Sequence, residues 1–312
     1  NKMKKIKFSI IIPARNEEEG IERAINSIQK QTHKDFEVII SNDGSTDKTR
    51  EIVEGLIKKD KRIRILNRKE GRSAAFARNR GAEKANGEII VFLDADTFLK
   101  DNFLEEINKC KSRVDGYACD CFSSHKTIVN YALSGMTIPI IAKKKMYSKL
   151  DKDRLMFFCV TKKAYKKIGG YSEEIFYFED EDFANKFYDA GFKSAFIKDT
   201  CQYFELPSTF SEFIRQSSWI AKGLNSIKDS KKRRSVKFKW LAKSILLLLP
   251  LFFLKTNLAL LVFCITAGIV YLNLIIRNKN LIKSLVSLPF LYVKTIFITS
   301  KLIIKSFQVR LK

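Results

Sequence analysis

The sequence contains little histidine and no CxxC cysteine pair. Its 312 residues include two histidines, His33 and His125, and six cysteines, none of them in a CxxC arrangement. Structural zinc sites need Cys and His ligands at short spacings, so we expect no such site and we expect reduced thiols. We also expect no signal peptide, because lysines lead directly into an apolar run at residues 6–12. We therefore expect the front of the chain to stay in the cytoplasm.

Acidic residues are almost missing from the C-terminal third of the chain. Residues 207–312 hold 19 of the 58 lysines and arginines but only two acids, Glu212 and Asp229. Most of the net charge of +24 therefore lies where basic clusters alternate with long apolar runs. This pattern is typical of contact with an anionic membrane surface and argues against a nucleic-acid partner. With 46% hydrophobic residues, the chain can bury a full core.

Two apolar segments, residues 241–254 and 258–276, lie close together in this basic part. The second is about long enough to cross the hydrocarbon core, whereas the first contains Pro250 and is short. Basic residues on both sides predict a transmembrane hairpin with both ends cytoplasmic, although a buried helical hairpin of a soluble domain is the alternative. Within residues 281–310, one polar stripe predicts an amphipathic helix lying in the membrane interface. The stripe consists of Lys283, Ser287, Lys294, Lys301 and Lys305.

Short apolar runs rich in β-branched residues alternate with helical patterns in the N-terminal part. Strands are predicted at residues 6–12, 36–41, 62–66 and 88–93, and helices at residues 17–30, 47–59 and 73–85. This alternation implies right-handed crossovers and a parallel sheet with helices on both faces. Later in the chain we expect a strand at 155–161, a turn at Gly169–Gly170 and a helix at 180–190.

Polar residues follow three of these strands, where ligands of such sheets bind. The segments Pro13–Glu17, Asn42–Asp47 and Asp94–Asp96 are therefore predicted to line one crevice. If residues 94–96 are extended, both carboxylates point to the same side and, with phosphate oxygens, suit Mg2+ or Mn2+. Asp43 stands where a carboxylate can accept hydrogen bonds from a nucleobase, and Asp47 is expected to cap the next helix.

Four consecutive acids occur at Glu179, Asp180, Glu181 and Asp182. They cannot all lie on one side of a helix. We expect Glu179 and Asp180 to face the crevice, Glu181 to face outward, and Asp182 to lie near the helix start, where its charge favours the dipole. An acidic loop that only caps the helix is the alternative.

The order of these motifs resembles the family 2 glycosyltransferases, which have the GT-A fold, a Rossmann-like mixed α/β sheet with helices on both faces. The resemblance is carried by SIIIPARNEE, EVIISNDGSTDKT, GRSAAFARNRGAEKANGEIIVFLDADT, KKIGGYSEEIFYFEDEDFANKFYDAGF and LPSTFSEFIRQSSWIAKG, within residues 6–223. It implies a catalytic domain at residues 1–206. Interface helices and a basic segment at 207–240, a transmembrane hairpin at 241–276 and the amphipathic helix at 277–312 would follow.

The resemblance also implies a role for each matching residue. Asp43 would bind the base, Asp94 the nucleoside, Asp96 the metal, and Asp180, with Glu179, would serve as the catalytic base. Further contacts to the nucleotide-sugar would come from Pro13, Arg15, Glu17, Arg72, Arg78 and Ala95. Arg78 could instead neutralise the carboxylates. Acceptor contacts would come from Gly170, Arg215 and Trp219.

Together these features predict an inverting enzyme that moves a sugar from a UDP-sugar, with GDP less favoured, to a lipid or lipid-linked saccharide at the cytoplasmic face of the cell membrane. A polyprenyl-phosphate monosaccharide synthase would need no base for its ionised acceptor. A processive polysaccharide synthase carries Gln-x-x-Arg-Trp, of which only Trp219 is kept, and that tryptophan could equally be a core residue. A nucleotidyltransferase and a non-catalytic membrane scaffold are the remaining alternatives. Relatives often have a metal-binding histidine where this chain has Gln202–Glu205.

Overall fold

The computed structural model describes residues 7–110, 114–124, 159–176 and 179–226, with short helical pieces between residues 234 and 298. The chain forms two compact units. The N-terminal unit combines Asn1–Phe122 with Lys145–Phe204, and the C-terminal unit combines Ser123–Lys144 with Glu205–Lys312.

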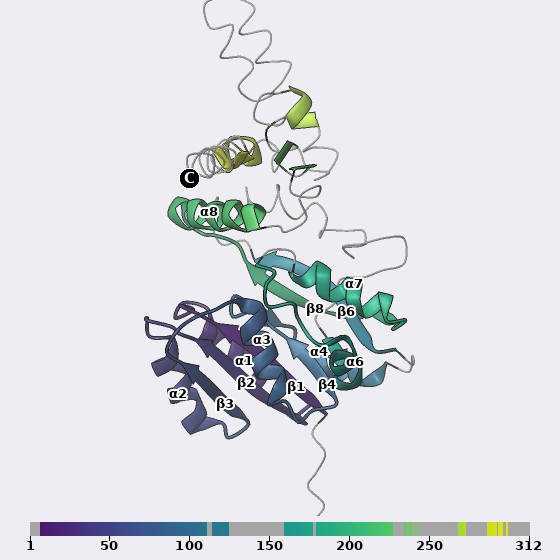
Figure 1. Cartoon of the computed structure of the whole chain (residues 1–312). Coiled ribbons are helices and arrows are strands. Elements are labelled where there is room, and N and C mark those ends of the chain that lie inside the picture. The colour runs from purple at the N-terminus through teal and green to yellow at the C-terminus, as the bar shows by residue number, and fades with distance from the viewer. Residues whose placement is uncertain are drawn as a thin grey trace, which may run out of the picture. The chain divides into compact units, whose positions relative to one another are not determined.

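An eight-stranded sheet forms the centre of the N-terminal unit, in the order β3-β2-β1-β4-β7-β6-β8-β5 (Figure 1). The strands are Phe8–Ala14 (β1), Phe36–Asp43 (β2), Ile63–Arg68 (β3), Ile89–Phe92 (β4), Thr97–Leu99 (β5), Gly116–Ser124 (β6), Cys159–Thr161 (β7) and Ser194–Glu205 (β8). The helices are Ile21–Gln29 (α1), Thr49–Lys59 (α2), Ala74–Glu83 (α3), Phe103–Lys109 (α4), Lys162–Ile168 (α6), Glu179–Asp189 (α7) and Phe210–Ser226 (α8). The first four strands in the order are parallel, whereas β7 runs antiparallel to both β4 and β6. The predicted mixed α/β sheet is therefore confirmed.

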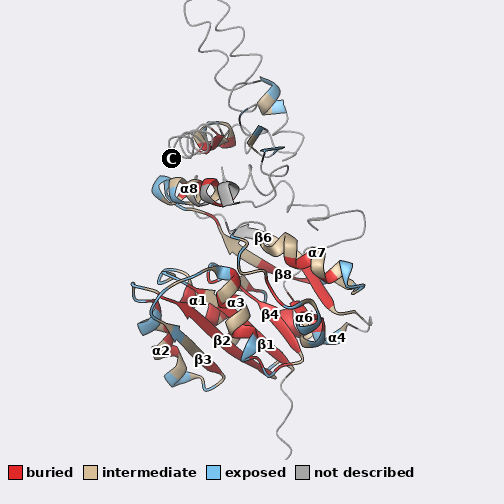
Figure 2. Ribbon diagram, in the orientation of Figure 1, coloured by how far each residue is buried: buried red, intermediate tan, exposed pale blue. Residues whose placement is uncertain are grey.

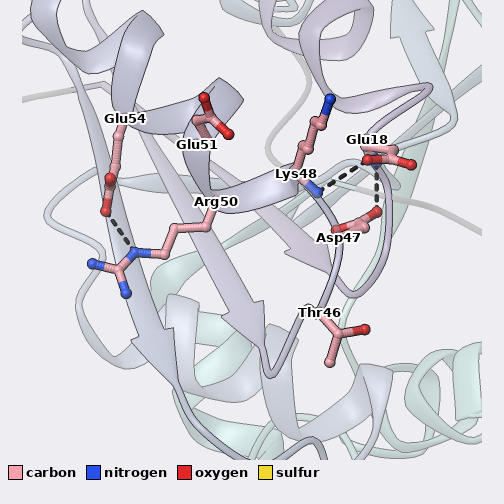
Figure 3. A pocket seen from close by; sticks show the side chains of 7 residues that line it. All are labelled: Glu18, Thr46, Asp47, Lys48, Arg50, Glu51 and Glu54. Atoms are coloured by element: carbon pink, nitrogen blue, oxygen red, sulfur yellow. Dashed lines mark hydrogen bonds and ion pairs between the residues drawn. The ribbon is translucent and has the colours of Figure 1, made fainter.

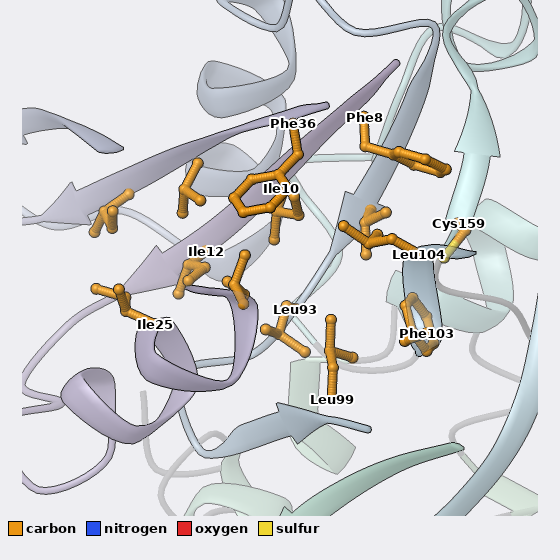
Figure 4. Close-up of a cluster of buried hydrophobic side chains, with 14 of the residues drawn as sticks. Phe8, Ile10, Ile12, Ile25, Phe36, Leu93, Leu99, Phe103, Leu104 and Cys159 are labelled. Carbon is orange, nitrogen blue, oxygen red and sulfur yellow. The ribbon is translucent and has the colours of Figure 1, made fainter. Parts of the chain in front are cut away.

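Helices cover both faces of this sheet, as predicted. Side chains of α1, α2 and α4 pack with Phe8, Ile10 and Ile12 in one buried cluster (Figure 4). Side chains of α3, α6 and α7 pack with Ile11 and Ile39 in another. The alternation of these β1 residues between two cores is what a strand buried on both faces requires. Burial is accordingly concentrated along the central strands (Figure 2).

Strand β1 continues through Pro13, where the sequence predicts that it ends. The Ile11 carbonyl accepts from Leu93 N, so the backbone groups of Ile11, and of Pro13 two residues on, face the β4 side. The β4 ladder ends at the pair Ile11–Phe92. Pro13 therefore faces a position where no ladder hydrogen bond is needed, and its missing N–H costs nothing.

In the C-terminal unit, the Phe213 ring of α8 contacts the Phe290 ring, with centroids 5.6 Å apart. Ser287 and Lys294, two members of the predicted polar stripe, are buried. Helical spacing places them on the same side as Phe290, which packs against α8. A helix in the membrane interface would turn its polar stripe toward the lipid headgroups, so the predicted orientation is wrong at these two positions.

Among the described residues, no helix is both long and apolar enough to cross a membrane. Most of the predicted hairpin at residues 241–276, and most of the predicted interfacial helix at residues 277–312, lies outside the described part of the chain.

Candidate active site

The loop after β1 is bound tightly to the loop after β2. Asn16, whose φ of 59° is tolerated by asparagine, donates from its backbone N–H to Ser45 Oγ at 3.0 Å. Its Oδ1 accepts from the backbone N–H of Thr46 at 2.8 Å, and Glu17 N donates to Thr49 Oγ1 at 2.8 Å. Two of the three loops predicted to line one crevice therefore do meet.

A surface hollow of about 550 Å³ lies between these loops and α2 (Figure 3). It is lined by Glu18, Thr46, Asp47, Lys48, Arg50, Glu51 and Glu54. The N-cap residue of α2 is Lys48. Asp47, just before it, accepts from Thr49 N at 3.0 Å and from Glu18 N at 3.1 Å, so it satisfies the first backbone donor of α2 and also fastens the β1–α1 loop. Because Arg50 pairs with Glu54, several charges here are used within the fold.

Asp43, at the end of β2, is buried and keeps one oxygen unused. Its Oδ2 accepts from the backbone N–H of Arg72 at 2.6 Å, whereas Oδ1 is shielded from solvent and has no hydrogen-bond partner among the described residues. A Cβ added to Gly71 would come within 2.6 Å of both the Arg15 guanidinium and the Asp43 carbonyl. Arg15 therefore lies beside Asp43, and the site combines a free acceptor with nearby donors.

Asp94 and Asp96 stand on a tight turn, so the predicted extended conformation is wrong. Thr97 N donates to the Asp94 carbonyl at 2.9 Å, which closes a β-turn. Both carboxylates are exposed, but Ala95 is buried, and a Cβ on Gly20 would lie only 2.7 Å from the Ala95 carbonyl. The start of α1 therefore abuts this turn, which brings the third predicted loop to the crevice.

The surrounding protein and the charge of Asp94 together raise the pKa of Asp96 to about 6. Within the described residues, no group of three or more His, Cys, Asp or Glu side chains could hold a metal ion. The pair after β4 therefore offers carboxylate oxygens from two residues only.

Arg78 joins acids from two distant parts of the chain. This buried side chain of α3 pairs through Nη2 with Asp94 Oδ1 at 2.8 Å. Its Nη1 lies 3.3 Å from Glu179 Oε1 and 3.9 Å from Asp180 Oδ1. Burial disfavours the charge of Arg78, but these carboxylates outweigh burial and raise the pKa of its guanidinium further. Glu179 and Asp180 therefore both turn toward Arg78, and the geometry favours neutralisation of the carboxylates over direct diphosphate contact.

Asp180 has the properties of a base poised near neutral pH. Burial raises its pKa to about 6, against the lowering effect of Arg78. The Asp180 side chain nevertheless remains 39% exposed, so it is open to an incoming group.

Other predicted site residues are less directly placed. Arg72 is exposed, stacks on the Phe76 ring at 4.2 Å and pairs with Glu173 at 3.4 Å. Gly170 is buried with φ of 69°, and its missing Cβ makes room for neighbouring side chains, so a backbone requirement explains this glycine. Arg215 and Trp219 lie on α8 in the C-terminal unit.

Sequence reasoning did not single out Tyr171, although this aromatic residue follows the predicted Gly169–Gly170 turn. Its ring lies under the Arg78 guanidinium, 5.2 Å from centroid to Cζ, and it is almost fully buried. An aromatic residue between a two-glycine turn and an acidic helix start was the available signal.

The family model for glycosyl transferase family 2 matches residues 9–176, which is more than half of the chain and includes the crevice loops described above. The chain belongs to glycosyl transferase family 2. This membership confirms the predicted family and agrees with the sheet and with the acids at its carboxyl end.

Two curated members of the family illustrate the likeness. An uncharacterized glycosyltransferase of Haemophilus influenzae is 42% identical over 99 residues, which cover 32% of this chain and 40% of that protein. A GalNAc(5)-diNAcBac-PP-undecaprenol beta-1,3-glucosyltransferase of Campylobacter jejuni is 38% identical over 113 residues, covering 36% of each chain. The matched stretches therefore span well under half of these relatives.

Solved structures share the fold at low sequence identity. The mannosyltransferase PcManGT from Pyrobaculum calidifontis, in complex with GDP-Man and Mn2+, superposes with a TM-score of 0.56 at 15% identity, covering 96% of this chain and 87% of that one. TarS 1–349 of S. aureus, in complex with UDP-GlcNAc, gives a TM-score of 0.53 at 17% identity, covering 93% and 90%. These likenesses support the GT-A fold.

Proposed function

We propose that this family 2 member is an inverting, metal-dependent glycosyltransferase that moves a sugar from UDP to a hydroxyl group of a lipid or lipid-linked saccharide. The observation that carries the proposal is the meeting of Asp94 and Asp180 on one buried arginine, Arg78. This arrangement sets an acid of the donor side and a base of the acceptor side at opposite ends of one guanidinium.

The single free oxygen of Asp43 favours uracil over guanine. Uracil presents one N–H donor between two carbonyls, whereas guanine presents two adjacent donors that would need both oxygens of a carboxylate. Asp43 Oδ2 is already occupied by the N–H of Arg72, so only Oδ1 is free to accept. Arg15, next to Asp43, supplies donors for a base carbonyl. Since the solved neighbours bind either UDP-GlcNAc or GDP-Man, the fold alone does not choose the base.

The oxygens of Asp94 and Asp96 suit Mg2+ or Mn2+, which bind through one or two carboxylates together with phosphate oxygens and water. A divalent ion bound there would stabilise the charge that develops on the departing diphosphate. In this proposal Asp96 holds the ion and Asp94, paired on one oxygen with Arg78, contacts the nucleoside.

Asp180 acts on the acceptor. Its carboxylate takes the proton from the acceptor hydroxyl as that oxygen attacks the anomeric carbon, opposite the leaving diphosphate, so the configuration inverts. Glu179 shares Arg78 with Asp180 and keeps the guanidinium in place. A lipid-linked acceptor at the cytoplasmic membrane face is supported by the name of the Campylobacter jejuni relative and by the basic, apolar C-terminal sequence.

Transfer can be measured with the full chain, Mn2+, a panel of UDP- and GDP-sugars and a lipid-linked saccharide. We expect Asp96→Ala and Asp180→Asn each to lower transfer by at least about a hundredfold. Glu174→Gln, which changes an exposed carboxylate on the loop before α7, serves as the matched control and should leave the rate unchanged. We also expect UDP to raise the unfolding temperature more than GDP does.

Other outcomes would separate the alternatives. Full activity of Asp180→Asn would contradict a hydroxyl acceptor and point to an ionised phosphate acceptor. Release of pyrophosphate would indicate a nucleotidyltransferase, and nucleotide-sugar binding without turnover would indicate a scaffold.

A further inference from the structure

The side chain of Asn79 on α3 uses all of its hydrogen-bonding groups to hold the turn at Gly169–Tyr171 and the side chains beside it. Its Oδ1 accepts from the Tyr171 backbone N–H at 2.9 Å and from the Tyr165 hydroxyl at 2.7 Å. Its Nδ2 donates to the Tyr171 carbonyl at 2.9 Å and to Glu173 Oε1 at 3.1 Å. A primary amide has two donor hydrogens and two acceptor lone pairs, so this set satisfies it completely. The side chain therefore fixes both backbone groups of Tyr171.

The turn can approach the Asn79 side chain closely because it contains Gly170, which has no Cβ. A Cβ on Gly170 would come within 2.7 Å of Asn79 Oδ1 and 2.6 Å of the Tyr165 hydroxyl. Only glycine therefore allows the turn to approach the amide this closely, and glycine also accepts the positive φ found there. From the opposite side, Lys186 of α7 donates to the Gly170 carbonyl at 2.6 Å.

Tyr171, held in this way, packs against Arg78 and against α7, the helix that contains Asp180. Its ring lies under Arg78 and stacks on Phe183 of α7, with centroids 4.3 Å apart and an angle of 14°. Phe183 follows Asp180 by three residues, so it lies one turn further along the same helix. Asn79 and Arg78 are neighbours on α3. One helix therefore positions both the arginine and the side chain that holds Tyr171, which packs against the helix of Asp180. Sites supported on rigid elements hold their geometry best.

We propose that Asn79 is a positioning residue for sugar transfer, which acts through Tyr171 to hold Arg78 and Asp180 in register on the acceptor side of the crevice. This inference rests on the proposed function. It assigns to the amide no contact with the donor or the acceptor. Its loss should therefore slow the chemical step and leave donor binding almost intact.

The test is the steady-state kinetics of Asn79→Asp in the full chain. This change keeps the size of the side chain and the acceptor oxygen, but it replaces Nδ2, which donates to Tyr171 and Glu173, with a second acceptor. We expect kcat to fall by about ten- to a hundredfold, as misplacement of a catalytic group by an ångström does. The KM for the donor should stay within about threefold of the wild-type value, and UDP should still raise the unfolding temperature as it does in the wild type.

A double-mutant cycle separates positioning from a general loss of structure. Tyr171→Leu removes the aromatic ring that lies under Arg78 and stacks on Phe183. If Asn79 acts through Tyr171, the double variant should be scarcely slower than the slower of the two single variants. Should Asn79→Asp fold poorly, Tyr165→Phe is a milder variant, because it removes only one donor to Asn79. We expect its kcat to fall as well.

Asn102→Asp is the matched control. Asn102 also ties two elements together, donating to the Asp199 carbonyl at 3.1 Å and accepting from Thr200 Oγ1 at 3.2 Å, but its partners are not site residues. It should lose stability and keep kcat. Wild-type kcat in both Asn79→Asp and Tyr165→Phe, or strictly additive losses in the cycle, would overturn the inference while leaving the proposed function standing. A wild-type chain that transfers no sugar would instead overturn the proposed function and the inference with it.

Discussion

Replacement of Asp43 by asparagine should change which nucleotide the chain binds. The substitution keeps the shape of the side chain but leaves one oxygen and one amino group. Because the N–H of Arg72 needs an acceptor at 2.6 Å, the amide oxygen should face Arg72 and the amino group should take the place of the free Oδ1. A donor then faces the N–H of uracil, which is also a donor.

The expected magnitude follows from these two losses. UDP loses a hydrogen bond to a charged acceptor and meets an unpaired donor, a cost of about 1.5–3 kcal/mol. Since 1.4 kcal/mol corresponds to a factor of ten, UDP should bind the Asp43→Asn variant roughly ten- to a hundredfold more weakly. Cytosine carries an acceptor at the ring nitrogen where uracil carries the N–H, so CDP should lose far less or gain. The free variant should be at least as stable as the wild type, because a buried, unsatisfied carboxylate oxygen is removed.

Titration calorimetry with UDP and CDP, with Mn2+ present, measures the ratio of the two affinities directly. The ratio is its own control, because a general loss of folding weakens both nucleotides equally. An unchanged preference for UDP in Asp43→Asn would refute the assignment of Oδ1 to the base. Thermal unfolding of the free variant checks the expected gain or retention of stability.

Three further predictions concern other features of the fold and the site. Because Asp180 must be ionised to act as a base and has a pKa of about 6, kcat/KM should rise with pH up to about 6 and then level off, as a pH profile will show; a rate that falls over this range would contradict the role. Arg78→Met should cost about 3–5 kcal/mol in urea unfolding because it leaves the largely buried Glu179 carboxylate without its cationic partner. The exposed Arg50→Met should cost less than about 1 kcal/mol, and equal costs would refute this account. Gly20→Ala should destabilise by about 1–3 kcal/mol because its Cβ meets a backbone carbonyl. Gly55→Ala, in open space on α2, should stabilise by about 0.4–1 kcal/mol, and melting temperatures compare the two.

The sequence predicted the parallel half of the fold well because its strands are continuous apolar runs between clear turns. The runs at residues 36–41 and 88–93 became β2 and β4 with small shifts at their ends. The short strand β5 was missed because its three residues carry no periodic pattern, and it forms through pairing with β8. The antiparallel strands β6 and β8 mix buried and half-buried residues irregularly, so neither an alternating nor a continuous pattern marks them.

The acids of the site were predictable, but their partners were not. Asp94 and Asp180 were marked by position after a buried strand and at a helix start. Arg78 lies 16 residues from Asp94 and 101 residues from Glu179 in the sequence, yet it forms hydrogen bonds with both. Such a contact depends on how α3 and α7 pack over the same face of the sheet. The role of Asn79 was hidden for the same reason, since its partners come from a turn that no local pattern connects to α3.

At the crevice, the positive charge of Arg78 is smaller than the total negative charge of the carboxylates beside it. Three carboxylates, those of Asp94, Glu179 and Asp180, lie within 4 Å of the Arg78 guanidinium, and Asp96 stands on the same turn as Asp94. The surrounding protein and neighbouring carboxylates raise the pKa of both Asp96 and Asp180 to about 6, so both groups titrate just below neutral pH. A nucleoside diphosphate would add further negative charge to the same place. The proposed divalent ion therefore has two tasks, to stabilise the leaving group and to let an anionic donor approach an acidic site. Because Arg78 is occupied on the base side, a divalent ion held by Asp96 would supply positive charge on the donor side.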